Sequence, residues 1–249
     1  MLRRRTRPAA GWPHRFLAPR PGLRDDAFRS YWREIHGPLV ASSPGYAAYR
    51  HRYVQNHVLA PGPVGDGFAF AGMAEFWLPG DNEDEFSSTS IYRDRIRPDE
   101  MEFIDMQGTV SMSALEQVLK PGRGPVKIVV LSGRAAGVNT EHFRDRFASA
   151  FVEAALKEQG FGRHLRGWSA DFVIQGSFRL PGARPVTALQ IDCIQSFWFD
   201  SDDAMKAAFA ALGVAQRVTA VCDSIFSAES WRSFKAEELV FFDHGRALV

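Results

Sequence analysis

Residues 20–45 read RPGLRDDAFRSYWREIHGPLVASSPG, and this stretch decides the fold. Its apolar residues recur at the three- and four-residue spacing of a helix: Phe28, Tyr31, Trp32, Ile35 and Leu39. Asp25 or Asp26 is suited to cap the start of that helix. Gly37-Pro38 is expected to disturb it just after His36, because a proline forces the preceding residue away from helical backbone angles. The stretch therefore predicts an amphipathic helix that carries a histidine near its carboxyl end.

The same pattern returns further along the chain. Phe28-Arg29 and Gly45 are matched by Phe143-Arg144 and Gly160 at an offset of 115 residues. Phe76-Trp77 is matched by Phe197-Trp198, and Glu116 by Glu237, both at an offset of 121. An insertion of six residues in the Gly- and Pro-rich loop at 176–185 reconciles the two offsets. We predict two homologous repeats, joined by the turn-rich linker at 120–125.

Each repeat is expected to run strand, helix, strand, strand, helix, strand. In the first repeat we expect strands at 14–18, 46–55, 68–78 and 110–119, and a second helix at 84–95. In the second we expect strands at 126–131, 163–174, 187–199 and 231–242, with helices at 140–158 and 202–220. Thr140 is the expected helix cap there and Gly160 the expected helix stop.

This order predicts an α+β fold of two ferredoxin-like βαββαβ repeats with antiparallel sheets. The helices of a repeat lie on one face of its sheet, and the aromatic-rich opposite face must also be covered. Two such sheets in one chain can cover each other as a pseudo-dimeric barrel. We expect a disordered basic tail at 1–12, the first repeat at 13–121 and the second at 122–249.

Composition excludes several classes of protein. Thirty Lys and Arg against 29 Asp and Glu leave a net charge of +1, which argues against a nucleic-acid surface or a polybasic membrane anchor. No run of 18 apolar residues predicts a membrane span, and no apolar segment of an export signal follows the basic start. Two cysteines are too few for a disulfide scaffold. We therefore expect a cytoplasmic protein with neither a nucleic-acid nor a membrane partner.

Several motifs resemble the EthD family. They are Arg20-Pro21-Gly22-Leu23, the F-x-x-Y-W helix at 28–32, His36-Gly37-Pro38-Leu39, Pro44-Gly45 and the A-E-F-W at 74–77. The resemblance covers about residues 14–120, and in the second repeat Phe151 stands at the position of His36. It implies the dimeric α+β barrel superfamily, which includes cofactor-free monooxygenases, polyketide cyclases, dehydratases and other lyases. Membership of that fold constrains the site more than the chemistry.

Three residues are candidates for catalysis. His36, at the end of its helix, is expected at the mouth of the barrel as a general acid or base. Glu75 and Asp192 lie in strands expected to be buried, and either could be its proton partner. A structural alternative remains for each: a histidine bonded to a backbone carbonyl, and carboxylates paired with arginines.

Rings and polar side chains on the strands are expected to line a substrate pocket inside the barrel. Tyr49, His51 and Tyr53 share one strand face, and Arg50 and Arg52 lie on the other, so this assignment could be inverted. The full set of predicted binding residues is Tyr49, His51, Tyr53, Trp77, His164, Trp168, Gln190, Ser196 and Trp198.

The chain lacks the spacing of a helix-borne metal motif, a glycine-rich phosphate loop and a G-x-S-x-G elbow, so we expect no metal and no organic cofactor. The leading hypothesis is a cofactor-independent lyase or dehydratase that acts on a hydrophobic, aromatic or polyketide-like molecule by acid/base elimination. The alternatives are a cofactor-free monooxygenase of an electron-rich phenol and a non-catalytic binding or accessory protein. The sequence leaves open whether the chain forms a homodimer.

Overall fold

The computed structural model describes residues 11–79, 85–177 and 180–244, and the predicted tail lies outside these residues as far as position 10. The first repeat contributes four strands: β1 (Trp12–Pro19), β2 (Arg52–Pro61), β4 (Gly72–Trp77) and β5 (Ile104–Lys120). The second contributes β6 (Val126–Ser132), β7 (Leu165–Ile174), β9 (Cys193–Phe199) and β10 (Arg232–Asp243). Two short strands, β3 (Asp66–Gly67) and β8 (Arg184–Pro185), pair with β10 and β5.

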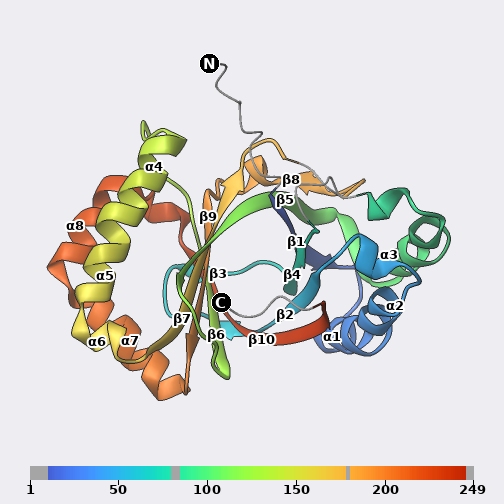
Figure 1. The fold of residues 1–249 in the computed structure, drawn as a ribbon, viewed down its shortest axis with the longest axis horizontal. Coiled ribbons are helices and arrows are strands. Elements are labelled where there is room, and N and C mark those ends of the chain that lie inside the picture. Colours follow the sequence, from blue (N-terminus) through green and yellow to red (C-terminus); the bar gives the residue numbers. More distant parts are fainter. Residues whose placement is uncertain (1–10, 80–84, 178–179, 245–249) are drawn as a thin grey trace, which may run out of the picture.

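The eight long strands close into one antiparallel barrel (Figure 1). Their order is β1-β4-β2-β10-β6-β9-β7-β5, and β5 pairs back to β1. The last strand of each repeat thus joins the two repeats, since β5 pairs with β7 and β10 pairs with β2. This confirms the predicted α+β barrel.

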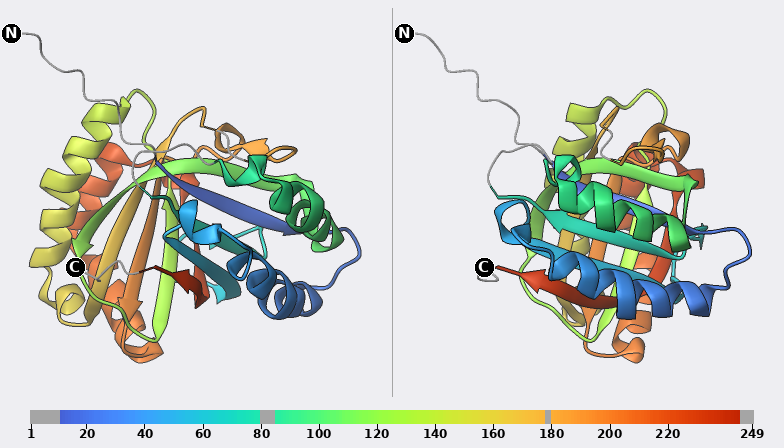
Figure 2. Two further views of the ribbon diagram at one scale, coloured as in Figure 1. Left: turned by 45° about the vertical axis from the view of Figure 1, so that its right-hand side comes forward. Right: turned by 90° about the vertical axis from the view of Figure 1, so that its right-hand side faces the viewer.

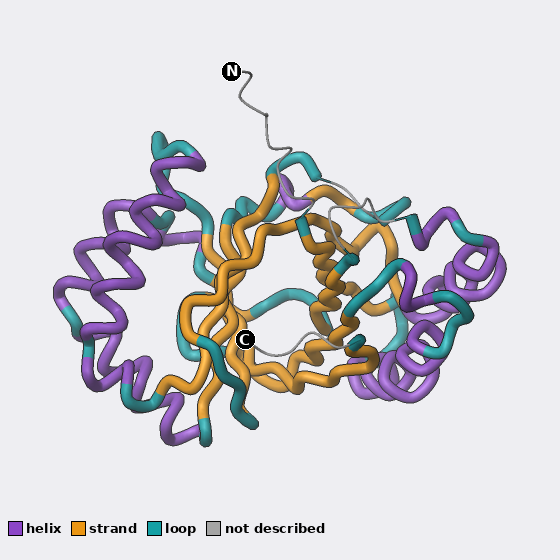
Figure 3. Tube along the Cα trace, in the orientation of Figure 1, coloured by secondary structure: helices purple, strands orange, loops and turns teal. Residues whose placement is uncertain are grey.

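Helices cover the barrel on two opposite outer sides (Figures 2 and 3). One side carries α1 (Asp25–Tyr31), α2 (Gly37–Ala41) and α3 (Arg97–Phe103), all from the first repeat. The other carries α4 (Thr140–Arg146), α5 (Glu153–Lys157), α6 (Gln159–Gly162), α7 (Asp202–Val214) and α8 (Gln216–Ile225). Within the described residues no single helix is long and apolar enough to cross a membrane, and α7 with α8 meets that test only as a pair bent by 75°.

Three apolar clusters fill this architecture. Two lie between the barrel wall and the helices, one for each repeat. The third lies inside the barrel and takes side chains from both repeats, among them Phe16, Met112, Val129 and Phe234. Because both faces of these strands are buried, apolar periodicity along a strand does not distinguish its inner face from its outer face.

The chain stays helical through Gly37-Pro38, contrary to the predicted disturbance. Residues Trp32–His36 form a π turn, in which the Gly37 N–H donates to the carbonyl of Trp32 five residues earlier. This wider turn accommodates Pro38, which has no N–H to donate. The same device precedes Pro98, where Tyr92–Ile96 form a second π turn ahead of α3.

Several predicted element boundaries are wrong. The strand predicted from Tyr46 begins at Arg52, after a short 3-10 turn, and the helix predicted at 84–95 lies over 92–103 instead. The strand predicted at 187–199 begins at Cys193, and the helix predicted at 202–220 is two helices, α7 and α8. The linker at 120–125 does separate β5 from β6 as predicted. Turn residues elsewhere indicate a loop but do not fix the residue at which the next strand or helix starts.

Three predicted helix signals also fall elsewhere. Asn139, not Thr140, caps α4 by accepting from the His142 N–H. Gly160 lies inside α6, while α5 ends at Lys157. The cap residue of α1 is Arg24, whose side chain makes no cap hydrogen bond; Asp25 and Asp26 occupy the first turn, where their charge favours the helix dipole and Asp26 accepts from the Ala27 N–H.

The register of the strands tests the predicted repeat. His14 pairs with Glu75 in the first repeat, and Val129 pairs with Ser196 in the second, which confirms both offsets. The last strands differ, since Met112 lies opposite His14 and Phe234 opposite Val129, an offset of 122. Glu116 therefore corresponds to Glu238 and not to the predicted Glu237, because one extra residue moves a side chain to the other face.

Candidate functional site

His36 was predicted at the barrel mouth, but it lies in the helix layer outside the barrel. It closes the first π turn, is 6% exposed, and contacts the Phe103 ring at 5.0 Å between centroids. Its Nδ1 lies 2.6 Å from Oδ2 of Asp99, and the Tyr31 hydroxyl donates to Oδ1 of the same carboxylate at 2.8 Å. Asp99 thus holds the imidazole in one orientation and is itself held by Tyr31.

The electrostatics of this pair keep the carboxylate ionised. Burial alone would raise the pKa of Asp99, but the hydrogen bonds from His36 and Tyr31 outweigh it and lower that pKa. Burial and the neighbouring Asp99 raise the pKa of Tyr31 to about 12, so its hydroxyl keeps its proton. An ionised carboxylate bound to Nδ1 leaves Nε2 of His36 as the nitrogen for proton transfer.

A small polar cavity adjoins His36 between the helices and the barrel wall. Its volume of about 10 Å³ has room for about one water molecule. Two buried cations face it: Arg15, which pairs with Glu100 at 3.3 Å, and Arg50, whose guanidinium lies over Phe76 and Phe86. Glu100 lines the cavity as well, so the site combines a histidine–carboxylate pair with two arginines and a second carboxylate.

The second repeat has a hollow at the corresponding place, with different chemistry. The repeat offsets match Arg15 with Val130, His36 with Phe151 and Phe76 with Phe197, and these three counterparts line a cavity of about 340 Å³. Its remaining lining is mostly apolar and comes largely from α7, α8 and the loops at Val64 and Trp231. The hollow of the first repeat is thus narrow and lined by charged side chains, and the hollow of the second repeat is apolar and large enough for a small organic ligand.

Gln195 is a buried polar residue in the lining of the second hollow. It lies on β9, is fully buried, and neither its amide nitrogen nor its amide oxygen has a hydrogen-bond partner among the described residues. A buried amide without partners is costly, by about 1–3 kcal/mol. Gln195 therefore offers a donor and an acceptor to a ligand in an otherwise apolar cavity.

Four predicted residues do face the barrel interior: Glu75, Trp77, Ser196 and Trp198. The Trp77 indole donates to Glu116 and the Trp198 indole donates to Glu238, each at 3.1 Å, so the two repeats make equivalent bonds. Arg52 lies over Trp77 and Arg123 over Trp198. These indoles are held in polar contacts and do not form the open pocket that was predicted.

The barrel interior also holds a buried charged cluster around Glu75. Lys127 pairs with Glu75 at 3.1 Å and with Glu238 at 2.8 Å, and His14 lies 3.7 Å from Glu75 and from Asp171. Burial would raise the pKa of Glu75, but Lys127 and His14 bring it below its ordinary value. Burial opposes a charge on His14, yet Asp171 and Glu75 raise its pKa to about 10.

The predicted tyrosine face is inverted. Tyr53 points to the helix layer, where its hydroxyl accepts from the Trp32 indole and its ring stacks on Phe76. Trp168, its counterpart, likewise stacks on Phe197 in the apolar cluster of the second repeat. Both strand faces are rich in large side chains, so periodicity could not identify the inner one.

The remaining predicted binding residues also lie outside the barrel interior. Tyr49 and His51 precede β2, and their rings contact Phe86 and His244. His164 precedes β7, where its Nε2 accepts from Arg163. None of the three is on a strand, because each β-strand starts later than predicted.

Asp192 and Gln190 line a shallow polar hollow at the edge of the second repeat. Asp192 accepts from the Arg134 N–H and from Gln175, and its carboxylate pairs with the Arg134 side chain at 3.4 Å. It is therefore a paired acid outside β9, as the structural alternative expected. His36, Glu75 and Asp192 thus lie in three separate places: helix layer, barrel interior and edge.

Asp99 and most of the interior cluster are not among the predicted site residues. Asp99 lies between the helix predicted at 84–95 and the strand predicted at 110–119. Lys127 and Asp171 stand among apolar residues, in VKIVVLS and WSADFVI, and an isolated charge in a buried strand needs a partner. That signal could have found both residues.

Comparison with known protein families finds a match over part of the chain. Residues 20–107 match the family model described as the EthD domain, within the segment where the sequence motifs lie. No curated protein is similar enough in sequence to count as a relative.

Two solved structures share the fold. One, described as a putative monooxygenase from Lactobacillus acidophilus NCFM, is 9% identical with a TM-score of 0.54, over 97% of this chain and 100% of that chain. The other, described in the same words, is from Fusobacterium nucleatum subsp. nucleatum and is 8% identical with a TM-score of 0.50, over 94% and 93% of the two chains. At this identity the likeness concerns the fold alone.

Proposed function

We propose, on the premise that residues 20–107 belong to the EthD domain family, that this protein is an acid/base enzyme acting on a hydrophobic small molecule. The reaction is an elimination of the lyase or dehydratase type, and the site is the polar hollow of the first repeat. The observation that carries the proposal is the His36–Asp99 pair beside a buried cavity that is also lined by Arg15, Arg50 and Glu100.

The chemistry follows from this geometry. Nε2 of His36 removes a proton from a carbon next to a carbonyl group, and Arg15 or Arg50 stabilises the negative charge that develops on the carbonyl oxygen. The imidazolium then returns the proton to a hydroxyl on the adjacent carbon. The C–H and C–O bonds break, a C=C bond forms and water leaves, so that no oxidant or organic cofactor is required.

Substrate binding requires a movement. The cavity at His36 has room for about one water molecule, so the helix layer must move away from the barrel wall to admit an organic substrate. Tyr46, Phe86 and Tyr92 line the same cavity and would contact an aromatic or polyketide-like ring.

The test is dehydration of an aromatic β-hydroxy ketone, followed by the ultraviolet absorption of the conjugated product. His36→Gln is expected to lower turnover by about 10²-fold or more, while Phe151→Leu, at the equivalent position of the second repeat, leaves it unchanged. Reaction under argon should match reaction in air. A reaction that consumes oxygen and stops under argon would replace the elimination by a monooxygenase, the activity named for both similar structures.

A second function, ligand binding without catalysis, is favoured by the apolar hollow. Its volume of about 340 Å³ and the unpartnered amide of Gln195 suit an apolar molecule with one polar group. Binding of a fluorescent naphthol that is lost in Gln195→Leu and kept in His36→Gln would support this function. If His36→Gln alone abolished binding, the ligand would lie in the first repeat.

A further inference from the structure

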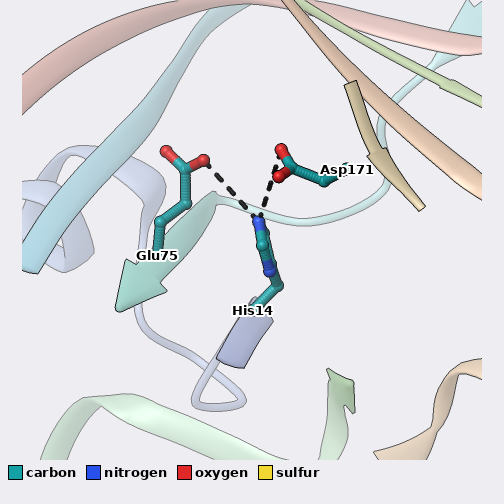
Figure 4. A group of neighbouring side chains, drawn as sticks. All are labelled: His14, Glu75 and Asp171. Atoms are coloured by element: carbon teal, nitrogen blue, oxygen red, sulfur yellow. Dashed lines mark ion pairs between the residues drawn. The ribbon is translucent and has the colours of Figure 1, made fainter. Parts of the chain in front are cut away.

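Three acid and imidazole side chains meet inside the barrel, away from both hollows (Figure 4). His14 comes from β1, Glu75 from β4 and Asp171 from β7, so both repeats contribute. They are 1%, 4% and 3% exposed. The three lie in the closed wall of the barrel, where strand pairing fixes their backbone positions.

Nε2 of His14 points between the two carboxylates. It lies 3.7 Å from Oε1 of Glu75 and 3.7 Å from Oδ2 of Asp171, and it has no hydrogen-bond partner among the described residues. These separations exceed the usual hydrogen-bond range of about 2.7–3.2 Å. The three ligand atoms nevertheless lie within 4.8 Å of one another, so a small inward movement of the side chains would bring each to the bonding distance of about 2.0–2.2 Å from one cation.

The neighbouring contacts orient these donors. Nδ1 of His14 lies 3.0 Å from the carbonyl of Trp12, which can only accept, so Nδ1 carries a proton and Nε2 is the nitrogen available to a metal ion. Metal-binding histidines almost always have such a bond on the other nitrogen. Glu75 uses Oε2 to accept from Asn56 at 2.5 Å and from Lys127, which leaves Oε1 facing His14.

The cluster needs positive charge at its centre. Glu75 and Asp171 both face Nε2 of His14, while Lys127 bonds to Glu75 and Glu238 on the other side of the cluster. Without a metal ion, a proton on His14 supplies the positive charge between the two carboxylates. A divalent ion that displaces this proton would supply that charge and bond to all three side chains.

We propose that His14, Glu75 and Asp171 bind one divalent metal ion of the Mn²⁺ or Zn²⁺ type. One imidazole and two carboxylates form a mixed nitrogen and oxygen donor set suited to these ions. Because Asp171 comes from the second repeat and the other two ligands from the first, the ion links the repeats through the barrel interior. Its role is structural, and the site is separate from the His36 hollow.

The test is metal binding by the full chain after treatment with a chelator. We expect one equivalent of Zn²⁺ to bind in competition with a chromophoric chelator, and the thermal-unfolding midpoint to rise with Zn²⁺ concentration as for any ligand of the folded state. Co²⁺ substitution in the unaltered protein should give the visible absorption of a protein-bound ion. Asp171→Asn and His14→Gln should each weaken binding by about 10²-fold or more, whereas Asp192→Asn should not change it.

Three outcomes would overturn the proposal. One is the absence of saturable Zn²⁺ or Mn²⁺ binding to the unaltered protein, together with an NMR signature of a His14 ring protonated on both nitrogens, which would mean that an imidazolium fills the site. Another is stoichiometric binding that persists in both ligand variants, which would place the metal elsewhere. The third is loss of binding in Asp192→Asn. Activity at His36 does not enter any of these measurements.

Discussion

The two helix–barrel interfaces occupy equivalent places and have opposite chemistry. In the first repeat, Trp32 and Gln55 donate to the hydroxyl of Tyr53, and His57 bonds to Gln55. At the equivalent positions of the second repeat stand Phe147, Ala170, Trp168 and Phe172, all in one apolar cluster. Covalent fusion removed the requirement that both halves be identical, so one repeat could keep a polar site while the other became an apolar container.

The largest effect is expected from a substitution that removes the charge of the His36–Asp99 pair and keeps the shape of the side chain. Asp99→Asn is expected to lower turnover by about 10²–10⁴-fold, because an amide no longer fixes the proton on Nδ1 of His36. NMR of the labelled ring should show the change of tautomer, which a merely structural role would not produce. Tyr31→Phe, which removes only the bond to Oδ1, should cost much less. Unchanged turnover in Asp99→Asn would exclude this pair from the reaction.

The next effect tests whether the buried ions hold the first repeat together. Glu100 accepts from Arg15, Tyr92 and Arg97 and is 1% exposed. Glu100→Gln leaves Arg15 buried without this carboxylate and should lower the free energy of unfolding by about 3–5 kcal/mol in urea titrations. Glu102→Gln, on the same helix but in an exposed pair with Arg20, is the control and should have almost no effect.

A change of the opposite sign is expected in the second repeat. Gln195→Leu removes an amide without partners from an apolar cavity and should raise the free energy of unfolding by about 1–3 kcal/mol. Gln55→Leu should instead destabilise the protein, because Gln55 bonds to Trp32, Tyr53 and His57. Thermal unfolding of the two variants measures the contrast. A lower free energy of unfolding for Gln195→Leu would contradict the conclusion that the Gln195 amide has no hydrogen-bond partner.

The last effect concerns pH and is the smallest for a change of one pH unit. Burial, aided by Arg33 and Arg29, lowers the pKa of His57 from 6.5 to about 3. Between pH 6.5 and about 3 the unfolded chain binds a proton at this position and the folded chain does not. The free energy of unfolding therefore decreases as the pH is lowered, by up to about 1.4 kcal/mol per unit. His57→Phe copies the second repeat and should reduce this slope, whereas His142→Gln, on the exposed side of α4, should not.

The repeat could be predicted because it depends on the spacing of residues along the chain. The site could not, because it depends on which face of each strand points into the barrel. Matching aromatic pairs such as Phe76-Trp77 and Phe197-Trp198 keep their spacing whatever the fold, so two halves and a barrel followed from them. Whether Tyr53 points inward or outward depends on which face the partner sheet covers, and both faces of β2 are buried. The bond between His36 and Asp99 spans 63 residues and two helices, and no local pattern reports it.

The position of β10 has a consequence for synthesis of the chain. β2 lies at the edge of the first repeat until Val240 and its neighbours pair with Val54 and the rest of that strand. These closing residues follow all the other strands in the chain, so the nascent first repeat carries an uncovered strand edge until β10 has been synthesised. Truncation within β10 would leave that edge open permanently and favour aggregation over a folded half.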